Sequence, residues 1–76
     1  MTLAQASEGQ ELTVKNLAGG FGFRRRLLGL GIHPDQHLYV LKSGILGGPI
    51  LVRVSGSQVA IGREAADKVE VELSNG

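Results

Sequence analysis

Apolar and polar residues alternate along five short stretches of the chain, with the period of two that is typical of half-buried β-strands. The stretches cover residues 11–15, 37–42, 50–54, 59–61 and 69–73. Ser55-Gly56-Ser57 separates the third stretch from the fourth, and this pair gives the clearest β-hairpin pattern in the chain. The pattern therefore predicts about five short strands.

The spacing changes between the first two strands. Phe23, Leu27 and Leu30 follow one another at i, i+4 and i+7, which predicts a helix over 23–30 with these three side chains on its buried face. Gly31 is expected to be the left-handed residue that ends the helix. A second helical turn is predicted over residues 62–67, just before the last strand.

The opposite side of the predicted helix carries a run of three arginines. Arg25 lies opposite the buried face, with Arg24 and Arg26 on its flanks. Leu28 projects onto the same wet side, between Arg24 and Arg25. We therefore expect this helix to present both charge and one apolar side chain to solvent.

These elements predict a mainly β fold, a small barrel of about five strands with one short helix after the first strand. One domain is expected to span residues 1–76, with an ordered part of about 3–73. Residues 1–8 and 74–76 are predicted to be loose. Closure of the barrel is expected to remove the exposed strand edges that so short a sheet would otherwise present.

Composition narrows the function classes. The chain has 76 residues and no cysteine, which excludes disulfides and thiolate metal sites and does not favour a self-contained enzyme. The net charge is +1, but residues 15–53 are mainly basic and residues 63–72 mainly acidic. No apolar run approaches the roughly 20 residues of a membrane helix. The first residues lack the pattern of a signal peptide, so a cytoplasmic protein is expected.

Two histidines are the candidate metal ligands. His33 and His37 have i, i+4 spacing, which on a helix would offer two ring nitrogens to one ion, with Asp35 between them. Pro34 opposes a helix here, so a turn into the second strand is the expected structure. We predict no dedicated metal site and no cofactor, only adventitious binding of a divalent ion.

The glycines of residues 19–22 precede the helix and could cradle a phosphate, and Arg24, Arg25 and Arg26 could contact nucleic acid. No Gly-Lys-Ser/Thr follows the glycines, and the aromatic residues that stack bases are scarce. A tight turn and a solvated helix face are the expected structures. No nucleophile has a credible base, so no catalytic residue is predicted.

Two groups of exposed apolar residues are candidate partner contacts. Leu28 on the helix and Ile45-Leu46 in the loop of residues 44–49 are expected to be exposed, and a cluster of such residues marks an interaction surface. Together with Arg24 and Arg25, they are the predicted partner-binding residues.

Three separated motifs, in order, resemble the FeoA-like domain family. Residues 24–34 are similar to its Arg-Leu-x-x-Leu-Gly-(Ile/Leu)-x-Pro-Gly signature, residues 47–56 to its Gly-Pro hairpin and residues 59–71 to its closing segment. Asp35 stands where the family usually has Gly, but Asp tolerates a left-handed turn. Gly62 stands where Leu is common, which removes one apolar side chain.

The resemblance implies an SH3-like barrel and a small, non-enzymatic cytosolic accessory protein of bacterial ferrous iron transport. Such proteins act by protein–protein interaction on the membrane transporter FeoB, which has a cytosolic GTP-binding domain. An exposed arginine of the accessory protein could stimulate GTP hydrolysis by that domain. The resemblance also implies transition-metal binding, because related domains form the C-terminus of metal-dependent repressors.

The sequence is also compatible with two other functions. One is a metal-binding regulatory domain that uses His33, Asp35 and His37, and a weaker one is a nucleic-acid-binding barrel. Neither nucleic-acid binding nor direct membrane insertion is predicted, and a homo-oligomer stays open.

Overall fold

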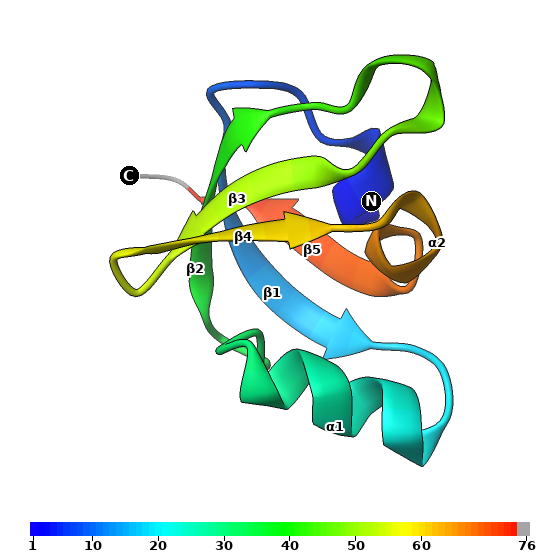
Figure 1. Cartoon of the computed structure of the whole chain (residues 1–76). Helices are drawn as coiled ribbons and strands as arrows, with labels where there is room; N and C mark the ends of the chain where they lie inside the picture. Colours follow the sequence, from blue (N-terminus) through cyan, green and yellow to red (C-terminus); the bar gives the residue numbers. More distant parts are fainter. Residues whose placement is uncertain (75–76) are drawn as a thin grey trace.

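Five strands form one antiparallel sheet that curls around the core, and a helix lies across one end of it (Figure 1). The computed structural model of the chain describes residues 1–74, apart from the side chain of Ile45. The sheet has the order β4-β3-β2-β1-β5. Its elements are η1 (Leu3–Gln5), β1 (Glu11–Leu17), α1 (Phe21–Gly29), β2 (His37–Lys42), η2 (Ile45–Gly47), β3 (Ile50–Val54), β4 (Ser57–Ile61), α2 (Arg63–Ala66) and β5 (Val69–Leu73).

The core is aliphatic, and the strands supply most of it. Side chains that alternate along β1, β2, β3 and β5 are buried, as the period of two predicts. The largest fully buried side chains are Leu3, Leu12, Val14, Ile32, Val40, Ile50, Val52, Val69 and Val71. The mainly β architecture expected from the sequence is therefore confirmed.

The predicted hairpin joins β3 to β4. Ser55 and Gly56 both have positive φ, 50° and 78°, which is the geometry of a type I′ turn. This turn matches the right-handed twist of the two strands. It places Val54 opposite Ser57 and extends the register to Ile50 opposite Ile61 without a shift.

The predicted helix exists, but its bounds differ from the expected ones. It begins at Phe21 and ends at Gly29, so the prediction that Leu30 occupies the buried face is wrong. Leu30 has φ −89° and ψ 0° and is 45% exposed, because the chain leaves the helix before the i+7 position. Gly31 turns the chain with φ 87°, as expected, and Ile32 enters the core instead.

The prediction that residues 1–8 are loose is also wrong. Leu3 and Ala6 are buried in the core, and Thr2 forms a β-bridge with Glu70. The Val71 N–H donates to the Met1 carbonyl at 2.8 Å. Two apolar residues in a short helical turn carry no periodic signal, which is why the pattern missed them. At the other end the Ser74 N–H bonds to β1, whereas residues 75–76 lie outside the described residues.

The sheet curls, but its two outer strands do not pair with each other within residues 1–74, so the expected removal of exposed edges is incomplete. The outer edge of β5 receives Met1 and Thr2. The outer edge of β4 has no neighbouring strand in the part of the chain that the structure describes. Among the described helices, none is long and apolar enough to cross a membrane.

Candidate functional site

One face of α1 carries apolar and cationic side chains together. Phe21, Arg24, Arg25 and Leu28 follow one another at i, i+3, i+4 and i+7, which places them in one stripe along the helix. Phe21 is 72% exposed and Leu28 is 50% exposed. The other face of the helix packs on the sheet through buried Leu27 and half-buried Phe23. The core therefore holds the helix in place while the stripe stays free.

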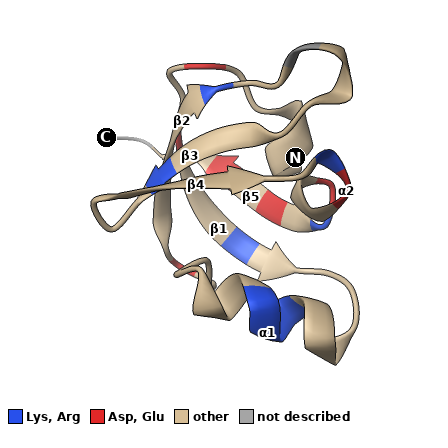
Figure 2. Cartoon of the chain, viewed as in Figure 1, with Lys and Arg blue, Asp and Glu red and all other residues tan. Residues whose placement is uncertain are grey.

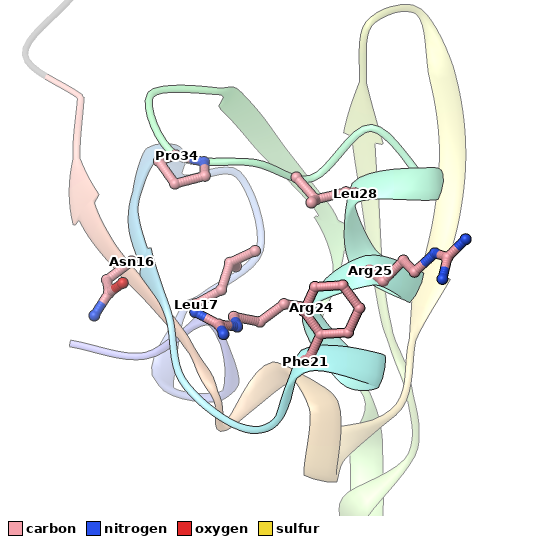
Figure 3. Close-up of a pocket in the computed structure, with 7 residues that line it drawn as sticks. All are labelled: Asn16, Leu17, Phe21, Arg24, Arg25, Leu28 and Pro34. Carbon is pink, nitrogen blue, oxygen red and sulfur yellow. The ribbon is translucent and has the colours of Figure 1, made fainter.

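The stripe borders a groove of about 480 Å³ between α1, the end of β1 and the turn that precedes β2. Figure 3 shows Arg24 extending toward Leu17, whereas Arg25 points outward. Its lining residues are Asn16, Leu17, Phe21, Arg24, Arg25, Leu28 and Pro34. The groove thus has an apolar lining with guanidinium groups beside it.

The arginines of α1 have no carboxylate partner among residues 1–74. The ion pair that the structure contains joins Lys15 to Glu72 at 3.7 Å, on β1 and β5. Figure 2 shows the arginines as a blue block on α1, while acidic positions lie on β5, at α2, in the segment before β1 and in the turn that leads into β2. An unpaired cluster of cations beside apolar side chains suits an acidic partner surface.

The loop between β2 and β3 carries the other predicted partner residue whose side chain is described. Leu46 is fully exposed and has φ 56°, a left-handed conformation that is uncommon for leucine. Figure 1 places this loop at the opposite end of the sheet from α1. The structure therefore brings Arg24, Arg25 and Leu28 together but does not bring Leu46 to them.

Arg63 holds that loop. Its guanidinium donates to the Ala4 carbonyl at 3.0 Å and to the carbonyls of Gly44 and Gly48 at 2.7 and 3.5 Å. Gly44 has to be glycine, because a Cβ there would overlap the Gly48 carbonyl. The sequence shows Arg63 only as one member of an acidic segment, and nothing in its pattern indicates these backbone contacts.

The candidate metal ligands lie on a turn, as predicted. His33 Nδ1 donates to the Pro34 carbonyl at 2.9 Å, whereas His37 Nδ1 lies 3.4 Å from Thr13 Oγ1. Asp35 has φ 72°, the left-handed conformation expected at this position. Within residues 1–74 no three His, Cys, Asp or Glu side chains are placed to share an ion. In this structure His33, Asp35 and His37 therefore do not converge on one ion position.

Four residues of the groove are not predicted by the sequence patterns, namely Asn16, Leu17, Phe21 and Pro34. Phe21 lies outside the predicted helix, because that prediction begins at Phe23, two residues after the observed start. Its spacing of seven from Leu28 is the signal that could have found it. The other three come from β1 and from a turn, and their meeting depends on the sheet.

A model of the FeoA domain family matches residues 1–73. The chain belongs to the FeoA family. This confirms the resemblance, and the family is associated with Fe²⁺ transport. A Methanocaldococcus jannaschii protein assigned as Fe²⁺ transport protein A is 40% identical over 70 residues, which cover 92% of this chain and 83% of that protein.

A second relative contains FeoA and FeoB in one polypeptide. The FeoA/FeoB fusion protein of Porphyromonas gingivalis is 30% identical over 73 residues, which are 96% of this chain but 9% of the fusion protein.

Solved structures confirm the SH3-like barrel. The crystal structure of an iron uptake regulatory protein, FeoA, matches with a TM-score of 0.91 at 32% identity and covers 97% of both chains. A manganese-dependent transcriptional repressor in complex with manganese matches with a TM-score of 0.90 at 28% identity. The match covers 97% of this chain but 36% of the repressor.

Proposed function

We propose that the chain is a non-enzymatic, cytoplasmic accessory protein of ferrous iron transport, which acts by binding a FeoB-type transporter. Family membership supports the process, and the fusion of FeoA to FeoB in one relative supports the partner. The observation that carries the proposal is the groove beside α1, where exposed Phe21 and Leu28 lie with arginines that lack a carboxylate partner within residues 1–74.

In this proposal the groove accepts an apolar side chain of the transporter's cytosolic part. Burial of Phe21 and Leu28 supplies the favourable free energy, because each apolar side chain removed from water contributes about 1.5–3 kcal/mol. Arg24 and Arg25 attract carboxylates at the rim and fix the orientation of the complex. Whether it is fused to the transporter or separate from it, the FeoA chain then acts on the FeoB-type transporter.

Fe²⁺ uptake tests the proposal. Cells that lack this protein but contain the FeoB-type transporter would be complemented with the wild type, Leu28→Glu or Leu30→Glu, and the accumulation of radioactive iron measured. Leu30 is the matched control, since it is equally apolar and 45% exposed at the same end of α1 but does not line the groove. We expect Leu28→Glu to lower uptake to the level of the empty vector and Leu30→Glu to restore it.

If Leu28→Glu restores wild-type uptake at equal protein levels, the groove has no role in iron uptake. Leu46 stays a second proposed contact, and Leu46→Glu forms a separate arm of the experiment because its loop lies far from α1. A loss of uptake with Leu46→Glu alone would transfer the partner surface to that loop.

A metal-binding regulatory domain is the second candidate. The observation that favours it is the likeness to the manganese-dependent repressor. His33, Asp35 and His37 would be its ligands, and the turn that carries them would have to rearrange to bring them onto one ion. Calorimetric titration of the untagged protein with Fe²⁺, Mn²⁺ and Zn²⁺ tests it. Affinity no better than about 1 mM, which corresponds to about 4 kcal/mol, would end this candidate.

A further inference from the structure

The outer edge of β4 differs from the outer edge of β5. Met1 and Thr2 occupy the edge of β5, and Glu70 and Glu72 place charge on that strand. β4 has no charged residue and no proline over residues 57–61, and its ladder with β3 contains no bulge. Charge, proline and bulges are the features by which proteins protect exposed edges. The edge of β4 has none of them.

The register shows which backbone groups point outward. The two-residue turn makes Val54 and Ser57 a hydrogen-bonded pair, and the alternation of an antiparallel ladder then makes Val52 and Val59 the next such pair. The N–H and C=O groups of Gln58 and Ala60 consequently face away from β3. Within residues 1–74 no strand receives them.

We propose that this edge binds a second copy of the chain, by antiparallel pairing of β4 with β4 about a two-fold axis. Gln58 of one copy then pairs with Ala60 of the other, and the symmetry repeats the pair, which gives four backbone hydrogen bonds. Val59 lies opposite Val59 of the partner subunit, where the half-buried side chains complete their burial. The two sheets become one continuous sheet.

The absence of charge selects a second copy as the occupant. Pairing across a two-fold axis places Val59 opposite its own equivalent and Gln58 opposite Ala60 of the other copy, so like charges on this strand would lie close together and repel each other. Ser57, Gln58, Val59 and Ala60 avoid this, whereas a pair of β5 strands would oppose two glutamates. An antiparallel edge is also complementary to itself in donors and acceptors. This proposal is independent of the groove and of the transporter.

Sedimentation equilibrium of the full chain at increasing concentration tests the pairing. Because a single strand pair buries less surface than a standard interface, we expect a weak dimer with a dissociation constant of about 0.1 mM. Ala60→Pro removes one outward N–H without affecting the β3 ladder, since proline is tolerated where an edge N–H faces solvent. Ala60→Lys places like charges near the two-fold axis, and Ala60→Ser is the control.

We expect Ala60→Pro and Ala60→Lys each to raise the dissociation constant at least tenfold, and Ala60→Ser and Leu28→Glu to leave it within about twofold. Amide exchange at Gln58 and Ala60 should slow as the wild-type concentration rises. A wild type that stays monomeric at about 1 mM would overturn the proposal. So would a dimer that both Ala60→Pro and Ala60→Lys retain while folded, as judged by their circular dichroism.

Discussion

Arginine performs two different tasks at the two ends of this barrel. Arg63 is the half-buried first residue of α2 and donates to three backbone carbonyls of η1 and the loop before β3. Arg24 and Arg25 stand on the open face of α1, exposed and without a carboxylate partner within residues 1–74. The residue type is the same, but only at one end do carbonyls surround the guanidinium. Position in the fold therefore separates an arginine that stabilises the protein from those that are available to a partner.

The two ends of the barrel also differ in how their surfaces are built. The segment that Arg63 holds includes Gly44, which cannot accept a side chain, and Leu46 in a left-handed conformation. The groove at the other end is formed by side chains on a strand and a helix that the core already fixes. A rigid scaffold with exposed contacts is what a binding surface requires.

Loss of the Arg63 side chain should have the largest effect on stability. Arg63→Ala leaves the carbonyls of Ala4 and Gly44 without their donor, so we expect the free energy of unfolding to fall by about 2 kcal/mol. Arg25→Ala, the exposed counterpart, should change it by less than about 0.5 kcal/mol. Urea unfolding followed by circular dichroism measures both. Equal losses would contradict the division between the two ends.

Charge reversal on α1 should have a smaller effect, and on binding rather than stability. With Arg24→Glu we expect the affinity for the transporter to fall about tenfold, which corresponds to about 1.4 kcal/mol. Salt should weaken the wild-type complex between about 0.05 and 0.5 M, because it screens the attraction between exposed charges. Biolayer interferometry at several salt concentrations tests this. A wild-type affinity that is independent of salt would exclude an acidic partner surface.

Relief of strain in the loop should have the smallest effect. Leu46→Gly removes a left-handed cost of about 1–2 kcal/mol and adds a glycine entropy cost of about 0.5–1 kcal/mol. We therefore expect the protein to gain about 0.5 kcal/mol in stability. Thermal unfolding compares it with Leu46→Ala, which keeps the strain. Destabilisation by Leu46→Gly would mean that the leucine side chain stabilises the loop.

The sequence predicts the regular elements well where burial alternates. β2 and β3 have the expected bounds, and β1 and β5 contain the expected stretches, because one buried face enforces the period of two. The errors occur where no period operates. Leu30 does not lie on the buried helix face, because Gly29 and Gly31 end the helix early. Leu3 is buried in the core, although its segment is too short to show a periodic pattern.

The site could be predicted only in part. Arg24, Arg25 and Leu28 lie within one helical stretch, so helical geometry alone brings them together. Leu17 and Pro34 join them through β1 and the turn before β2, which no local pattern specifies. The role of Arg63 depends on carbonyl positions set by the tertiary fold, and those are invisible in side-chain patterns.

Direct titration of the purified FeoB-type transporter with this protein tests the central claim, that the groove beside α1 is the partner surface. We expect Leu28→Glu to raise the dissociation constant at least tenfold, and Leu30→Glu and Arg63→Lys to stay within about twofold of the wild type. Both Leu28→Glu and Leu30→Glu should unfold at the wild-type urea midpoint. Binding of Leu28→Glu as tight as that of the wild type would contradict it.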